Sequence, residues 1–234
     1  MAMKRTSIGK LFILAFLITV FLLVSILFVS SLLENKRESY ISDETQQVYN
    51  SLNEMQIFLL MSETYGQDMA CLAFDAKLKE LDKTVWSLGQ KIDQYRVASE
   101  EFRKNPYYQA QKHLFNENEV FYMMLLQKLK KECSFRQAVI AYFYQNSADC
   151  TKCDDQAYVL SDINRDIDPE VAIFSFDHDL NLTTVNLLER FYNVTQFPCV
   201  VIDDQTFCGI RGKAFIEQQM CLSNPEISLC ANAS

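Results

Sequence analysis

Hydrophobic and polar positions divide the chain into three stretches of different character. Residues 11–33 form an apolar run without a charged side chain. Residues 42–133 alternate apolar and polar positions at helical spacing, with almost no glycine or proline. From residue 137 onward, short β-branched and aromatic runs alternate with polar segments, which is typical of strands between helices. The pattern predicts an apolar helix, a helical middle and an α/β region.

The apolar run 11–33 is long enough for a transmembrane helix. At about 1.5 Å per residue, it can cross a hydrocarbon core of about 30 Å. Lys4, Arg5 and Lys10 precede it, and this positive bias predicts that residues 1–10 are cytoplasmic. We therefore expect a single-pass protein of the cell membrane, in contact with lipid through 11–33 and extracytoplasmic beyond it.

A cleaved signal peptide is the alternative interpretation of this run. Val29 and Ser31 could form a small-residue cleavage motif, but the run is much longer than an ordinary signal-peptide core. Both interpretations export the rest of the chain. Asn-x-Ser/Thr sequons at Asn181, Asn193 and Asn232 agree weakly with export, since such triplets also arise by chance.

The membrane-proximal region 34–135 is predicted to be α-helical. Asn105 and Pro106 interrupt its pattern, so we expect two long helices and a third, packed as an antiparallel bundle or hairpin. The helical stripes are Val48, Leu52, Met55, Leu59 and Ser62; Leu72, Leu78, Leu81, Val85 and Leu88; and Val120, Met123, Met124, Gln127 and Leu129. The aromatic side chains of this region are expected in its core rather than in a ligand site.

The α/β region continues from 136 to 222 and is followed by a tail at 223–234. Its predicted elements are a strand at 138–144, the motif Cys150-Thr-Lys-Cys153, a helix at 154–167, a strand at 171–176, a helix at 181–192, a strand entered at Pro198 and ending at 203, a strand at 206–209 and a helix at 212–220. A lone Cys-x-x-Cys could be half of a zinc site, but the chain has no second such motif. We therefore expect no metal and no cofactor.

This order of elements around Cys150 and Cys153 resembles the thioredoxin-like superfamily. The resemblance implies a central mixed sheet flanked by helices over 136–222. It also implies that Cys150 is the nucleophile of a thiol–disulfide exchange and that Cys153 resolves the mixed disulfide. Phe197 and Pro198 occupy the place of the family's cis-proline loop, which contacts the substrate peptide.

The sequence departs from the family's pattern at several positions. Asp149 stands where a tryptophan usually precedes the motif, and Tyr144 stands where many members carry a buried acid on the first strand. The dipeptide Thr-Lys inside the motif is typical neither of the usual reductases nor of the strong oxidases. Cys199 follows the proline, where threonine is common. Proton transfer during resolution would then use water or another group.

The other six of the eight cysteines are candidates for structural disulfides. They are Cys71, Cys133, Cys199, Cys208, Cys221 and Cys230. Their order suggests three bridges between consecutive cysteines, although six cysteines allow fifteen pairings. If Asp203 and Asp204 form a two-residue turn, Cys199 and Cys208 lie opposite one another. The alternative is that some are buried free thiols.

Charge excludes one class of partner. The formal net charge is −8 and no basic patch with interleaved aromatics is present, so nucleic-acid binding is not expected.

The leading hypothesis is a membrane-anchored thiol–disulfide oxidoreductase that acts on the thiols and disulfides of exported proteins, with a possible membrane redox partner. The alternative is a non-catalytic binding or scaffold protein whose Cys-x-x-Cys is a structural disulfide. The sequence does not decide the direction of electron flow.

Overall fold

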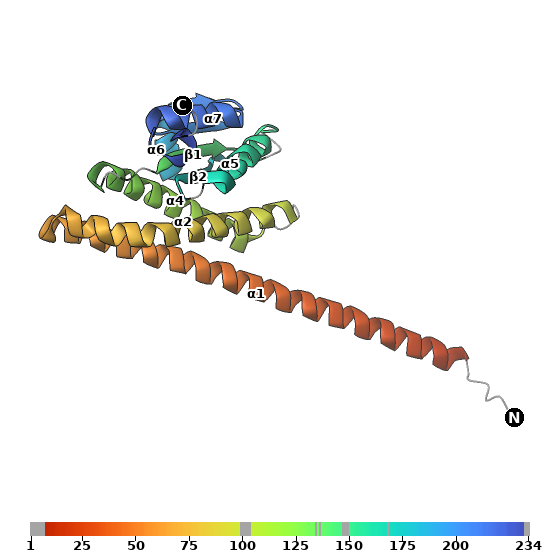
Figure 1. The fold of residues 1–234 in the computed structure, drawn as a ribbon. Helices are drawn as coiled ribbons and strands as arrows, with labels where there is room; N and C mark the ends of the chain where they lie inside the picture. The colour runs from red at the N-terminus through yellow and green to blue at the C-terminus, as the bar shows by residue number, and fades with distance from the viewer. Residues whose placement is uncertain are drawn as a thin grey trace. The chain divides into compact units, whose positions relative to one another are not determined.

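The computed structural model describes residues 8–98, 104–133, 135, 137–146, 150–167 and 169–231. These residues form two compact units that divide between Asp43 and Glu44. The interpretations placed on Lys4, Arg5, Asp149 and Asn232 fall outside the described residues. Figure 1 shows the helices and strands as a ribbon, with labels on several of them.

The elements, in chain order, are α1 (Ile8–Tyr65), α2 (Gln67–Ala98), α4 (Pro106–Cys133), β1 (Ala138–Tyr144), α5 (Cys153–Ile167), β2 (Val171–Asp177), η1 (His178–Leu180), α6 (Thr183–Phe191), β3 (Cys199–Ile202), β4 (Gln205–Cys208), α7 (Lys213–Ser223) and α8 (Ser228–Ala231).

The first unit contains a helix long and apolar enough to span a membrane. Its apolar segment is Phe12–Leu33, and none of that segment is buried inside the protein. The predicted apolar helix is therefore present. It does not end at residue 33, because α1 continues to Tyr65. Residues 34–41 carry neither glycine nor proline, so nothing in the local sequence ends the helix there.

In the second unit, the last part of α1 packs antiparallel to α2. Lys91 forms an ion pair with Glu44 at 3.0 Å. Farther along both helices, the rings of Phe58 and Phe74 meet edge to face, with their centroids 5.9 Å apart. Gly66 makes the turn between the helices at a φ of +96°, a value that glycine adopts without a steric penalty.

Helix α4 lies antiparallel to α2. The Cys71–Cys133 disulfide joins the start of α2 to the end of α4, and the Tyr122 hydroxyl donates to the Asp82 carboxylate midway along. The helical middle is thus the antiparallel arrangement that its periodicity predicts. Most residues of the predicted stripes are buried, but Met124 is exposed and Leu59 and Gln127 are half-buried. The side chains of Ser62 and Leu72 lie outside the described part of the chain.

The α/β region is built on one mixed four-stranded sheet with the order β2-β1-β3-β4. Strand β1 is parallel to β2 and antiparallel to β3, and β3 is antiparallel to β4. Tyr142 at the centre of the sheet lies opposite Ser175 on one side and Val200 on the other. The predicted central mixed sheet flanked by helices is therefore confirmed at this level.

Each face of the sheet is covered by helices. On one face, Ile140, Tyr142 and Val200 form a core with Ile163 of α5 and Ile216 of α7. On the other face, Phe143, Phe174 and Phe176 are fully buried. The Tyr122 ring of α4 packs edge to face on Phe174, with centroids 5.3 Å apart. Burial on both faces explains why β1 is a continuous apolar run instead of an alternating one.

Helix α4 also covers the open edge of β2 through three polar side chains. The backbone N–H of Ser175 donates to Glu119 at 3.0 Å, and that of Asp177 donates to Asn116 at 2.9 Å. Lys112 forms a buried ion pair with the Asp177 carboxylate. These contacts take the place of a fifth strand and protect an edge that would otherwise carry unpaired backbone groups. They also join the helical middle to the sheet.

One turn lies where the sequence predicted it, and one helix begins later than the sequence predicted. Asp203 and Asp204 have φ of 42° and 76° and make the predicted two-residue turn, so Cys199 and Cys208 lie opposite one another. By contrast, the helix expected from residue 181 begins at Thr183. Asn181 is in the left-handed region with φ 51° and ends η1, a short helix that the apolar periodicity did not separate from α6.

Candidate functional site

Cys150 and Cys153 form a disulfide at the start of α5. Their Cα atoms are 5.4 Å apart, which is ordinary disulfide geometry. Cys153 is the first residue of the helix, and only 6% of Cys150 and 2% of Cys153 is exposed. Thr151 and Lys152 between them are exposed. A partner would therefore approach over this dipeptide, and Cys150 is the more accessible of the two cysteines.

Backbone hydrogen bonds hold Cys150 and Cys153 in place. The Cys150 N–H donates to the Asn146 carbonyl at 3.0 Å, and the Cys153 N–H donates to the Cys150 carbonyl at 3.2 Å. Asn146 is held in turn, because its backbone N–H donates to the Asp179 carboxylate at 2.7 Å. Asn146, which follows β1, is therefore bonded to η1, which follows the neighbouring strand β2.

The segment with Phe197 and Pro198 is the second part of the site that the sequence predicts. The Phe197–Pro198 peptide bond is cis. The Gly209 N–H donates to the Pro198 carbonyl at 2.7 Å, which connects the segment to the end of β4. The rings of Phe197 and His178 lie 4.7 Å apart between centroids. Because His178 belongs to η1, this short helix contacts both the loop before Cys150 and the segment at Pro198.

His178 is itself held in place. Its Nδ1 lies 3.0 Å from both carboxylate oxygens of Glu189 on α6. The imidazole is half-buried beside the Phe197 ring. Sequence reasoning missed this residue, since a lone histidine after a strand carries no motif.

Charges around the motif act in opposite directions. The positive end of the α5 dipole and the exposed Lys152 place positive charge near Cys150. The exposed Asp154 and Asp155 in the first turn of α5 oppose it. Solvent screens both carboxylates, because they are exposed.

The remaining cysteines pair consecutively. The structure has disulfides Cys71–Cys133, Cys199–Cys208 and Cys221–Cys230, and no free cysteine is among the described residues. Cys199 follows the cis-proline and faces Phe143 across the β1–β3 pair. It therefore lies on the face of the sheet opposite Tyr142, whose hydroxyl bonds to the Cys153 carbonyl.

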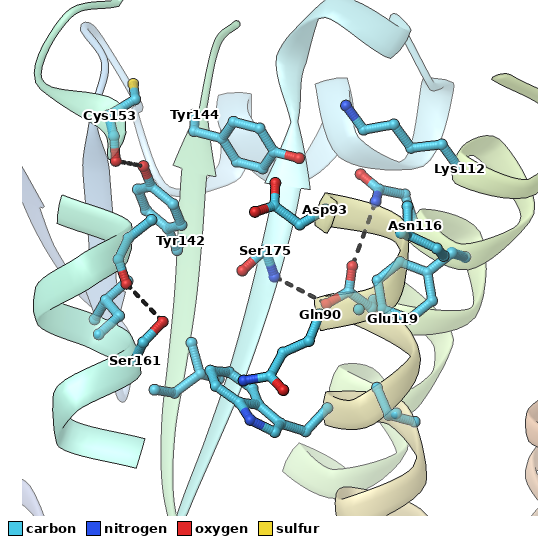
Figure 2. Close-up of a pocket in the computed structure, with 18 of the residues that line it drawn as sticks. Gln90, Asp93, Lys112, Asn116, Glu119, Tyr142, Tyr144, Cys153, Ser161 and Ser175 are labelled. Carbon is cyan, nitrogen blue, oxygen red and sulfur yellow. Dashed lines mark hydrogen bonds between the residues drawn. The ribbon is translucent and has the colours of Figure 1, made fainter. Parts of the chain in front are cut away.

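A pocket lies beside the start of α5, on the side of the helical middle (Figure 2). Its volume is about 160 Å³. Its lining comes from α2, α4, β1, β2 and α5, and includes Trp86, Asp93, Glu119, Tyr144 and Cys153. Figure 2 shows Tyr142 beside Cys153 in the lining, with the Tyr142 hydroxyl donating to the Cys153 carbonyl at 2.6 Å. The pocket thus reaches the backbone of the Cys-x-x-Cys helix.

Two pocket residues have shifted pKa values. Burial raises the pKa of Glu119 well above its usual range, although the Ser175 N–H and the Lys112 ammonium partly oppose this effect. Burial also raises the pKa of Tyr144, and the negative charges of Asp177, Glu119 and Asp93 add to the shift. Tyr144 is therefore a neutral phenol with carboxylates near it.

No pattern in the sequence predicted this pocket. Lys112, Asn116 and Glu119 recur at helical spacing, but a polar stripe on a helix ordinarily faces solvent. Their burial depends on the open edge of β2, which no local pattern in α4 reveals. Among the described residues, no group of three or more His, Cys, Asp or Glu is placed to hold a metal ion.

No protein-family model matches the chain, and no curated protein matches it either.

Proposed function

We propose that this protein is a membrane-anchored thiol–disulfide oxidoreductase with a thioredoxin-like domain outside the cell membrane. Cys150 and Cys153 carry the reaction, and the thiols or disulfides of exported proteins are the substrates. The apolar segment Phe12–Leu33 holds the protein at the bilayer. The orientation follows from the basic residues before this segment.

One observation carries the proposal: a Cys-x-x-Cys disulfide begins a helix while a cis-proline segment is connected to the same loop through η1. Asp179 accepts from Asn146 in the loop before Cys150, and His178 contacts Phe197. The order and pairing of the strands also agree with a thioredoxin-like fold. A zinc-binding or purely structural motif would not need the cis-proline segment.

The exchange is written as two disulfide transfers. In the oxidising direction, a substrate thiolate attacks the Cys150 sulfur, the Cys150–Cys153 bond breaks, and Cys153 leaves as a thiolate. A second substrate thiolate then attacks the substrate sulfur of the mixed disulfide, and Cys150 leaves as a thiolate. In the reducing direction, Cys150 attacks a substrate disulfide and Cys153 displaces the substrate. Phe197 and Pro198 would hold the substrate backbone in both directions.

Turnover needs a second redox partner. Each substrate oxidised leaves Cys150 and Cys153 reduced, so an oxidant must remove two electrons before the next cycle. Each substrate reduced leaves Cys150 and Cys153 oxidised, so a reductant must return two electrons before the next cycle. A membrane protein with its own thiols or disulfides is the partner that the anchor makes accessible.

The test is insulin reduction by the full-length protein in detergent, with dithiothreitol as the electron donor. We expect turnover above the dithiothreitol background, loss of turnover in Cys150→Ser, and retention in the matched pair variant Cys221→Ser/Cys230→Ser. The reduction potential of the Cys150/Cys153 couple should lie between about −120 and −270 mV, the range of catalytic pairs. No turnover, with a potential below about −300 mV, would exclude the enzyme.

Burial of the two sulfur-bearing residues favours a second candidate, the scaffold. Both cysteines are almost inaccessible in the disulfide form, as expected for a structural bridge. In this alternative the helical middle binds a partner and the Cys150–Cys153 bond only stabilises the domain. A very low reduction potential without turnover is the result that it predicts.

A further inference from the structure

We propose that the pocket between the helical middle and the sheet binds a small neutral molecule with one aromatic ring. The proposal does not depend on redox turnover, because it rests on the size, the walls and the polar contacts of the pocket. The volume of about 160 Å³ sets the size of the ligand. An apolar protein cavity of about 150 Å³ binds benzene, so this pocket has room for one ring and not for two.

Aromatic side chains supply much of the wall of the pocket. They are Trp86 of α2, Tyr108 and Phe115 of α4, and Tyr142 and Tyr144 of β1. The rings of Tyr142 and Tyr144 are stacked, with their centroids 5.4 Å apart and an interplanar angle of 20°. Aromatic rings favour stacked or edge-to-face contacts with other rings. The walls therefore favour an aromatic ligand.

The buried polar residues in the described lining are Lys112, Asn116 and Glu119, and each already has a partner in the chain. Lys112 forms an ion pair with Asp177. Asn116 accepts a hydrogen bond from the Asp177 N–H at 2.9 Å and donates one to Glu119 at 3.3 Å. Glu119 also accepts from the Ser175 N–H at 3.0 Å. A charged ligand buried here would lose its hydration without gaining a new counter-charge, so the pocket favours a neutral one.

The pocket lies close to the protein surface along α2 and α5. Its exposed lining residues are Gln90 and Asp93 on α2 and Asp154 and Ser161 on α5. Figure 2 draws Ser161 on the α5 side and Gln90 on the α2 side of the strands. Asp93 and Asp154 have interactions of their own within the chain. A ligand therefore does not have to cross the core, and the selection for a neutral ring does not depend on these two acids.

The chain contains its own reporter for ligand binding. Its single tryptophan, Trp86, lines the pocket and is half-buried, so its fluorescence responds to an occupant. Full-length protein in detergent is titrated with the neutral benzyl alcohol, the cationic benzylamine, the anionic benzoate and the two-ring 2-naphthylmethanol. Free N-acetyltryptophanamide in the same detergent is the control for quenching and for partition into the detergent.

We expect a saturable change with benzyl alcohol and at least about tenfold weaker binding of benzylamine and benzoate, because burial of an unpaired charge is costly. The two-ring compound should give no saturable response, because the volume admits only one ring. Benzylamine or benzoate binding as tightly as benzyl alcohol would contradict the selection for a neutral ligand. Equal binding of 2-naphthylmethanol would contradict the size limit, and no saturable response to benzyl alcohol would overturn the proposal.

Two variants locate the binding event. Ala157, a half-buried residue of α5, lines the pocket, and Ala157→Leu should abolish the response to benzyl alcohol because the larger side chain takes the space of the ring. Ala110→Leu is the matched control, since Ala110 is exposed on α4 outside the lining, and the affinity of this variant should equal that of wild type. Equal affinity in both variants would place the ligand elsewhere and overturn the proposal. Should Ala157→Leu fail to fold, discrimination among the four ligands by the wild-type protein still decides the proposal.

Discussion

The Tyr142 hydroxyl donates a hydrogen bond of 2.6 Å to the carbonyl of Cys153. Tyr142 is a buried residue of the central strand, and Cys153 begins the helix of the Cys-x-x-Cys motif. The bond connects the sheet to the backbone of the motif directly. Tyr142 and Cys153 both line the pocket, so the bond joins two of its lining residues.

Removing this hydroxyl tests how much the bond contributes. Tyr142→Phe keeps the ring and should lower the free energy of unfolding by about 1 kcal/mol, the usual contribution of one buried hydrogen bond. Urea unfolding followed by Trp86 fluorescence measures the loss. Tyr158→Phe on α5, the helix that Cys153 begins, is the control, since 74% of Tyr158 is exposed. The stability of this variant should stay at the wild-type value. A loss as large in Tyr158→Phe would show that the effect is not specific to the bond.

Glu119 should make stability depend on pH. Its pKa in the folded protein is raised above the usual 4.5 by burial, so the folded state holds the proton more tightly than the unfolded state. Its contribution is therefore most favourable below pH 4.5 and is lost as the pH rises toward the folded-state pKa. Glu119→Gln should flatten the decline in stability above pH 4.5.

Urea unfolding at a series of pH values gives this slope. Glu117→Gln is the matched control, because Glu117 is exposed on the same helix, and its slope should equal that of wild type. A slope in Glu119→Gln as steep as the wild-type slope would show that another group causes the decline.

The disulfides should differ in their contribution to stability. In the chain-entropy description, a bridge that closes a longer loop stabilises more. Cys71–Cys133 spans 62 positions and Cys221–Cys230 spans 9. Cys71→Ser/Cys133→Ser should therefore lose about 4 kcal/mol and Cys221→Ser/Cys230→Ser about 2.5 kcal/mol. Urea midpoints measure both, and a reversed order would contradict this assignment.

Mass spectrometry after alkylation without reduction checks the pairing itself. Unfolded wild-type protein should have few free thiols among the six cysteines outside the motif. Alkylation of all six would refute the disulfide framework.

Orientation is open to direct test. A membrane-impermeant protease added to intact cells should cleave the region beyond Leu33 and leave the N-terminus protected, because Lys4, Arg5 and Lys10 precede the apolar segment. Lysed cells, in which both sides are accessible, are the control. Protection of the whole C-terminal region would show the opposite orientation.

Local patterns in the sequence predicted much of the fold. Strand β1 occupies the residues expected from the apolar run 138–144, because burial on both faces leaves a clear signal. The turn at Asp203 and Asp204 was likewise foretold by two turn-forming residues between strands. The sequence did not predict that the helix continues past residue 33. A change from apolar to polar composition ends a membrane segment without ending a helix.

Long-range contacts were beyond sequence reasoning. Cys150 and Cys153 were found because their spacing is itself a motif. His178 and Phe197 come together only through the fold. The same is true of Lys112, whose burial follows from the edge of β2 and not from its neighbours in α4. The pocket depends on such contacts, and no pattern along the chain predicted it.

Trapping of a mixed disulfide tests the proposed reaction most directly. Cys153→Ser, expressed as the full-length protein in cells, removes the resolving thiol and should accumulate disulfide-linked complexes with exported proteins through Cys150. They should appear on non-reducing gels, disappear with reductant, and be absent in Cys150→Ser and in Cys150→Ser/Cys153→Ser. Equal trapping by the two single variants, or none by either, would contradict the assignment of Cys150 as nucleophile and Cys153 as resolving cysteine.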